Sequence, residues 1–207
     1  MKVLLVNGSP HKNGSTDRAL QEVAKTLEAG GVETEMFWIG TEPIGGCIGC
    51  GGCGKTGECV FGGPVVEFVR KAKEADGFVF GSPVHYAAAS GNMTSFLDRA
   101  FYSADADVFR FKPAAVVTAA RRGGTTAAYE QLLKYPGISH MPIVSSQYWN
   151  MVHGANAQDV EQDMEGLQTM RALGRNMAWL LHCIEAGRAA GIEPPALEPF
   201  QRTNFIR

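Results

Sequence analysis

Residues 1–16, MKVLLVNGSPHKNGST, decide how this chain folds. The run Val3–Val6 is short, apolar and rich in valine and leucine, which is typical of a parallel strand buried on both faces. A polar loop follows as far as Thr16, and from Asp17 onward apolar residues recur at helical spacing. Strand, loop and helix start together predict an anion site, because free backbone N–H groups and the helix dipole both favour a phosphate there.

The polar loop differs from two common phosphate-binding sequences. No G-x-G-x-x-G opens the helix and no G-x-x-x-x-G-K-[ST] is present, so it is neither a dinucleotide fingerprint nor a Walker A loop. Hydroxyl-rich loops suit a mononucleotide held by its terminal phosphate. The alternative is an ordinary turn capped by Ser15 or Thr16, but a plain cap would not need so long a polar loop.

Length and composition limit the class of protein. The 207 residues suit one domain over 1–207, with a cysteine-rich loop at 44–60 and a C-terminal helix and tail at 157–207. The net charge of −2 comes without a basic block, which argues against nucleic-acid binding. We expect no membrane span and no signal peptide, and therefore a cytoplasmic protein. In that compartment, clustered cysteines indicate metal or redox ligands and not structural disulfides.

Apolar runs alternate with amphipathic segments along the chain. The expected strands are 2–7, 32–39, 78–81, 113–120 and 142–145, and the expected helices begin near 17, 64, 94, 127 and 157, the last continuing to 191. This alternation predicts an α/β fold with a doubly wound, five-stranded parallel sheet. Ligands of such sheets bind beyond the carboxyl ends of the strands, so the loops 8–16, 82–91 and 118–125 should meet at one edge.

Three segments resemble one known family. N-G-S-P-H-K-N-G-S-T, residues 7–16, looks like the phosphate loop of the NAD(P)H-dependent FMN reductase group of flavodoxin-like proteins. Residues 82–99 are similar to the family's S-P-V-Y…S-G…K-x-F-L-D-R stretch, and residues 118–124 resemble its third flavin-contacting loop. The resemblance covers most of the chain, and it implies the strand order 2-1-3-4-5 with FMN at the switch between the first and third strands.

The resemblance also implies which residues contact FMN. The first loop would hold the phosphate, and the other two would lie along the isoalloxazine ring. The residues assigned to the cofactor in this way are Ser9, Pro10, His11, Asn13, Gly14, Ser15, Thr16, Pro83, Val84, His85, Tyr86, Gly91, Thr118, Ala119, Ala120, Arg121, Gly123 and Gly124. Arg121 or Arg122 would stabilise the anionic reduced flavin, and the alternative for both is a solvated basic turn.

The chain departs from the family pattern at two places. His85–Tyr86 stands where the family usually has an aromatic pair, and Thr94 replaces a common lysine. These departures leave the substrate pocket undefined, but they do not affect the prediction that the protein binds a flavin. We interpret Arg99 as part of a structural ion pair with Asp98 or a neighbour. Flavin chemistry needs little more than a shaped site, so no catalytic acid or base is assigned.

Cys47, Cys50, Cys53 and Cys59 form a C-x2-C-x2-C-x5-C pattern in a glycine-rich loop. It resembles the compact motif of the iron–sulfur flavoproteins, which carry FMN and a 4Fe–4S cluster, and loop N–H groups can bond to cluster sulfurs. Zinc fits less well, because its four-cysteine sites usually join two separate C-x2-C knuckles. Clusterless members of the group share the same loop, so thiols near the flavin or a redox pair remain the alternative. Cys183 is interpreted as a buried structural thiol.

The leading prediction is an FMN-dependent oxidoreductase that uses NAD(P)H to reduce a quinone, azo, nitro or free-flavin acceptor. The first alternative is a carrier with FMN and a 4Fe–4S cluster that passes single electrons between protein partners. The second is a flavin-free binding module with a structural metal. The aromatic-rich segment Phe96–Tyr102 and the pair Tyr148–Trp149 further predict a homodimer or higher homo-oligomer with the flavin near its interface.

Overall fold

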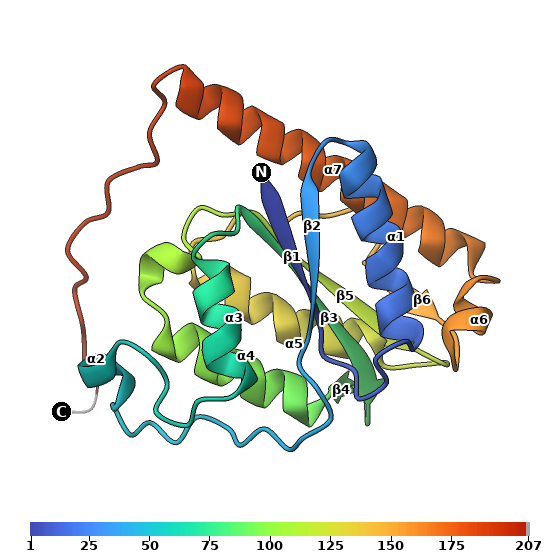
Figure 1. Cartoon of the computed structure of the whole chain (residues 1–207), viewed down its shortest axis with the longest axis horizontal. Coiled ribbons are helices and arrows are strands. Elements are labelled where there is room, and N and C mark those ends of the chain that lie inside the picture. The colour runs from blue at the N-terminus through green and yellow to red at the C-terminus, as the bar shows by residue number, and fades with distance from the viewer. Residues whose placement is uncertain (206–207) are drawn as a thin grey trace.

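A parallel sheet in the order β2-β1-β3-β5-β6 forms the centre of the computed structural model, which describes residues 1–205 (Figure 1). The strands are β1 (Lys2–Asn7), β2 (Glu33–Trp38), β3 (Gly77–His85), β4 (Ala88–Ala89), β5 (Ala114–Ala120) and β6 (Met151–His153). The helices are α1 (Ser15–Ala29), α2 (Cys53–Thr56), α3 (Pro64–Ala72), α4 (Gly91–Ser103), α5 (Thr125–Ile138), α6 (Ala157–Val160) and α7 (Met164–Ala189), with a 3-10 turn at Ala106–Val108. The last two residues of the expected tail, 206 and 207, lie outside the described residues.

The strand order confirms the predicted flavodoxin-like, doubly wound sheet. Strand β4 is antiparallel to β3 and lies off the main path, so the parallel strands alone follow the order 2-1-3-4-5. Each neighbouring pair on that path is parallel, as crossover helices require.

Helices cover both faces of the sheet. On β1, Val3 and Leu5 pack into the cluster that contains the apolar sides of α1 and α7, whereas Leu4 and Val6 pack into the cluster formed with α3, α4 and α5. All four side chains are fully buried. The continuous apolar run of β1 is therefore a strand buried on both faces, since side chains alternate along a strand.

The prediction of the last strand was wrong. Ile143 makes only an isolated bridge to Ala114, and the chain then leaves the sheet and returns as β6, which pairs with the end of β5. Val144 still donates its backbone N–H to the Ala114 carbonyl over 2.8 Å, and Thr118 donates to the Asn150 carbonyl over 3.0 Å. Two separate segments therefore pair with β5, residues 142–144 at its start and residues 150–153 at its end. Tyr148 and Trp149 lie in the loop that joins these two segments.

Two other boundaries differ from the expectation. Strand β3 continues through Ser82 and Pro83, which were expected in a loop, because both pair with β5 at Thr118 and Ala119. The single helix expected from 157 to 191 is broken into α6 and α7. Asp163 accepts a hydrogen bond from the Gly166 backbone N–H over 2.9 Å and so caps a new helix inside the expected one.

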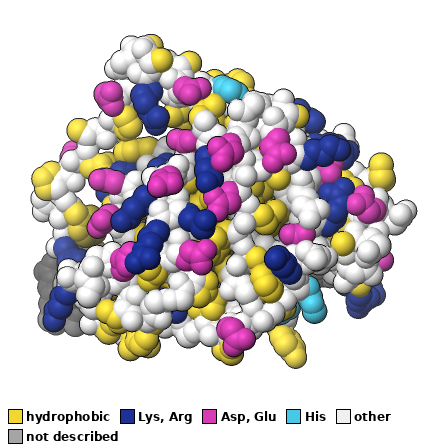
Figure 2. All heavy atoms as spheres, viewed as in Figure 1, with side chains coloured by type: hydrophobic (Ala, Val, Ile, Leu, Met, Phe, Trp, Pro, Cys, Tyr) yellow, Lys and Arg dark blue, Asp and Glu magenta, His cyan; other side chains and the backbone are white. Residues whose placement is uncertain are grey.

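The surface carries mixed charge. Basic and acidic side chains are interspersed over the face shown in Figure 2. No helix within residues 1–205 is both long enough and apolar enough to cross a membrane.

Candidate functional site

The loops after β1, β3, β5 and β6 meet at the carboxyl edge of the sheet and border an open cleft of about 600 Å³. We call it the loop-end cleft. Three of these loops are those that the sequence predicted to converge. Of the predicted FMN residues, those that line it are Ser9, His11, Asn13, Gly14, Ser15, Thr16, Pro83, Val84, His85, Ala119, Ala120 and Arg121.

The remaining predicted residues lie nearby but outside this lining. Pro10, Tyr86 and Gly123 are exposed, and Gly91 is the exposed first residue of α4. Thr118 is fully buried in β5, and its hydroxyl donates to the Thr125 carbonyl over 3.4 Å. Both arginines are exposed, and of the two Arg121 lines the cleft whereas Arg122 does not.

The fourth wall of the cleft consists of Gly154, Ala155 and Asn156, which the sequence reasoning missed. They follow β6, as the other lining loops follow their strands. The signal that could have found them was the same rule of convergence at carboxyl ends, but the rule was applied only to the first, third and fourth strands, and the last strand was placed at 142–145. Correct placement of β6 brings these residues to the cleft directly.

Asn7 holds the phosphate-type loop in shape. It is fully buried at the end of β1, and its side-chain oxygen accepts the Ser9 backbone N–H over 3.0 Å. Its amide nitrogen donates to the Lys12 carbonyl over 3.0 Å and to the Asp17 carboxylate over 3.4 Å. A single buried amide therefore fixes the two sides of the loop to the first turn of α1.

The first turn of α1 faces the cleft with open backbone donors. Gly14 is the N-cap, and it has no side chain that could bond to the N–H groups of this turn. Within the described residues, the first helical N–H with a backbone partner is that of Arg18, which donates to the Gly14 carbonyl over 3.0 Å. The N–H groups of the preceding turn, including those of Ser15 and Thr16, are therefore available to an anion at the positive end of the helix dipole. This donor set fits the phosphate of FMN.

A strained hairpin stands beside the cleft. Strand β3 turns into β4 through Tyr86 and Ala87 alone, and both have positive φ, 50° and 58°. Gly124, with φ 94°, caps α5 against this turn, and a Cβ there would lie 2.7 Å from Ala87 Cα. Gly124, which was predicted to let the backbone approach the flavin ring, therefore lets the start of α5 approach the hairpin closely. Left-handed backbone at non-glycine residues costs energy and clusters at functional sites.

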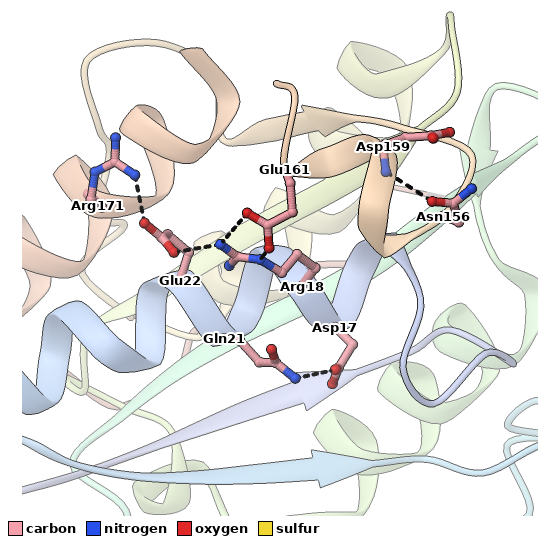
Figure 3. A network of polar contacts seen from close by, with 8 residues as sticks. All are labelled: Asp17, Arg18, Gln21, Glu22, Asn156, Asp159, Glu161 and Arg171. Atoms are coloured by element: carbon pink, nitrogen blue, oxygen red, sulfur yellow. Dashed lines mark hydrogen bonds and ion pairs between the residues drawn. The ribbon is translucent and has the colours of Figure 1, made fainter. Parts of the chain in front are cut away.

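Ion pairs hold the segment that follows the fourth wall against α1. Figure 3 shows Arg18 of α1 between Glu22 and Glu161, with Arg171 of α7 on the other side of Glu22. Burial opposes the charge of Glu22, but hydrogen bonds from Arg171 and Arg18 outweigh it and hold the pKa of that carboxyl below its ordinary value. Burial raises the pKa of nearby Asp17, although Asn7 and Gln21 donate to it.

All four cysteines of the loop line a second, small hollow of about 20 Å³. Besides the cysteines it is bordered by Ile48, Gly51, Val60, Phe61, Arg99, Tyr102 and Ser103. None of the cysteines is in a disulfide. Among residues 1–205 no three His, Cys, Asp or Glu side chains gather closely enough to hold a single metal ion. A cubane cluster makes a different demand, because each of its four irons takes one thiolate and the ligands stand further apart. The donor set therefore fits a cluster better than one ion.

Two sequence predictions near this hollow were wrong. Arg99 forms no ion pair within the described residues, because Asp98 instead accepts the Tyr135 hydroxyl over 2.6 Å. Cys183 is exposed on α7 and not buried.

The sequence matches the NADPH-dependent FMN reductase family over residues 1–156. The chain belongs to this family. An iron–sulfur flavoprotein of Methanocaldococcus jannaschii is 31% identical over 192 residues, which are 89% of this chain and all of that protein. A solved NADH:FMN oxidoreductase in its apo form aligns with a TM-score of 0.62 at 15% identity over 86% of this chain and 89% of its own, and an archaeal flavodoxin aligns at 0.60 and 15% over 88% and 99%. The protein is thus an oxidoreductase of the FMN-binding, flavodoxin-like kind, as the sequence predicted.

Proposed function

We propose that the loop-end cleft holds FMN and that the protein uses NAD(P)H to reduce a small-molecule acceptor of the quinone, azo, nitro or free-flavin type. The observation that carries the proposal is the open first turn of α1 at the floor of the cleft, where the loops after four strands converge. Residues 1–207 are taken as one FMN-binding domain, and the cytoplasm as its compartment.

Different residues of the cleft contact different parts of FMN in this proposal. Backbone N–H groups at Ser15 and Thr16 bind the phosphate, and Asn7 keeps their loop closed from below. Pro83, Val84 and the Ala119–Arg121 segment border the part of the cleft left for the ring. Hydride transfer from a reduced nicotinamide and electron transfer to an acceptor are the chemistry that FMN supplies when bound.

We also propose that Cys47, Cys50, Cys53 and Cys59 bind a 4Fe–4S cluster. The common hollow that they line supports it, and so does the name of the M. jannaschii relative. With FMN alone, the protein is a two-electron reductase. With FMN and a cluster, it also suits the alternative role of an electron carrier between protein partners.

Anaerobic purification tests both proposals. Released cofactor should run as FMN on chromatography, the protein should be brown, and it should carry about four irons per chain. FAD, or no flavin after reconstitution, would overturn the FMN site. A yellow, iron-free protein after reconstitution would overturn the cluster and the carrier role together. Steady oxidation of NADPH by the isolated protein with a quinone separates the reductase from the pure carrier.

We propose a homo-oligomer with the flavin near its interface. Tyr148 and Trp149 form an edge-to-face pair 4.6 Å apart, and both are at least half exposed. In the other predicted segment Phe96 is fully buried in the core, so only Tyr102 is left as a strongly exposed aromatic there. Exposed aromatics of this kind are common interface anchors. Light scattering that gives a monomer at micromolar concentration would contradict the proposal.

A further inference from the structure

Arg99 lies under the cysteine loop, on the inner side of α4. Only 7% of the residue is exposed. Its Nε donates to the Cys59 Sγ over 3.3 Å, and its terminal nitrogen donates to the Gly62 carbonyl over 2.8 Å. The ring of Phe61 covers the guanidinium, with 5.6 Å between the ring centroid and Cζ. The side chain is thus fixed on three sides, and one of those contacts is a cysteine sulfur.

Within the described part of the chain, no carboxylate pairs with Arg99, and the adjacent Asp98 accepts the Tyr135 hydroxyl instead. A buried cation is costly unless an anion pairs with it. The sulfur that the Arg99 Nε–H contacts is that of Cys59, and a thiol bound to a metal is deprotonated. With the cluster bound, Cys59 would therefore place an anion against the guanidinium.

We propose that Arg99 is a positioning residue for the iron–sulfur cluster, acting through the Nε–H···Sγ bond to Cys59. The inference rests on the cluster proposed above. A hydrogen bond and a positive charge at a ligand sulfur favour the more negative, reduced cluster, so Arg99 raises the reduction potential. It also orients the Cys59 sulfur toward the hollow that the other three cysteines line.

A matched control lies on α3, beside the same cysteine loop. Arg70 pairs with Glu58, the residue before Cys59, with nitrogen–oxygen distances of 2.7 and 2.8 Å. Its side chain is 66% exposed, and within the described residues it contacts no sulfur. R70Q therefore removes the same formal charge beside the same loop without touching a ligand.

The test is an EPR-monitored redox titration of anaerobically purified parent, R99Q, R99K and R70Q, with iron and FMN measured on each sample. R99Q should shift the cluster midpoint to a more negative potential, beyond any shift in R70Q. R99K keeps the charge but lacks the planar fork, so it should shift the potential in the same direction by less. A merely structural role for Arg99 would lower the unfolding temperature without moving the potential.

The outcomes separate the two proposals. An iron-free parent overturns the cluster, and this inference with it. An iron-loaded parent with R99Q at the parental potential overturns this inference alone. If R99Q does not fold or loads no iron, R99K decides: a negative shift supports the role of the Nε–H···Sγ bond, and an unchanged potential overturns it.

Discussion

The hydroxyl of Ser15 donates to the carbonyl of Gly154 over 3.0 Å, and this bond joins residues that are 139 positions apart in the sequence. It ties the first turn of α1 to the loop after β6. The ion pair of Arg18 with Glu161 extends the same connection one turn further along the helix. The first turn of α1, where we place the phosphate, is therefore bonded directly to the fourth wall of the cleft.

Ser15→Ala and Thr16→Ala should each weaken FMN binding. The Ser15 hydroxyl holds this turn to Gly154, and Thr16 lines the cleft beside the N–H groups that bind the phosphate. Loss of either hydroxyl should therefore loosen the turn and cost about 0.5–3 kcal/mol of binding free energy, which is roughly 2- to 150-fold in Kd. Titration of the apoprotein with FMN, followed by quenching of flavin fluorescence, measures it. Ser146→Ala is the matched control, because that hydroxyl donates to the Tyr148 carbonyl outside the cleft. Parental affinity in both variants would contradict the assignment of the phosphate to this turn.

Glu22→Gln should destabilise the protein in a pH-dependent way. Arg18 and Arg171 both pair with Glu22, whose pKa lies below the ordinary value of 4.5. A carboxyl with a depressed folded-state pKa contributes stability above its unfolded pKa and loses it as pH falls through the folded one. The deficit of the variant should therefore be about 1–3 kcal/mol near pH 7 and shrink below about pH 4.5.

Urea unfolding of the parent and E22Q from pH 7 to pH 3 measures this. Glu130→Gln serves as the control, because Glu130 is exposed on α5 and makes no ion pair within residues 1–205. A deficit that does not change with pH would argue that Glu22 acts through packing and not through its charge.

The sequence was sufficient for the sheet because its central strands are unambiguous. The apolar run Val3–Val6 has no helical period, and the polar loops that follow the strands must lie at one edge once the strands are parallel. The prediction of the last strand failed because two separate segments, and not one continuous strand, pair with β5. Residues 142–145 look like a strand and do pair with the start of β5, but the stretch that completes the sheet is the short β6, which has no apolar pattern of its own.

The partners of individual side chains were also beyond the sequence. Asn7 looked like a strand end, yet its buried side chain makes three hydrogen bonds, to groups two, five and ten residues further along the chain, and so organises the loop. Arg99 follows Asp98, which suggested a local ion pair, but a helix places neighbouring residues on different faces. One of the two therefore reaches the cysteine loop and the other reaches Tyr135. Such choices depend on tertiary packing, which spacing does not encode.

Replacing Tyr86–Ala87 with Asn-Gly should stabilise the fold. A two-residue hairpin with positive φ at both positions prefers Asn-Gly, and left-handed backbone costs roughly 1–2 kcal/mol per ordinary residue. We expect a gain of about 1–3 kcal/mol in the free energy of unfolding. Ala106→Gly, in the 3-10 turn where φ is not positive, should by contrast destabilise. An unchanged or lower stability in the double variant would show that the hairpin is not strained.

Cys47→Ala should abolish or convert the cluster, whereas Cys183→Ala should leave it intact. Cys47 borders the hollow with the other three loop cysteines, but Cys183 is exposed on α7 and lies outside its lining. Iron per chain and the broad visible absorption of anaerobic protein measure the difference. FMN content should stay at the parental level in both variants, because the phosphate is bound by α1 and its loop, which share no lining residue with the cysteine hollow. Loss of iron in C183A to the same extent as in C47A would mean that the iron is bound without a defined site, and a loss of FMN in C47A would mean that the two sites are not independent.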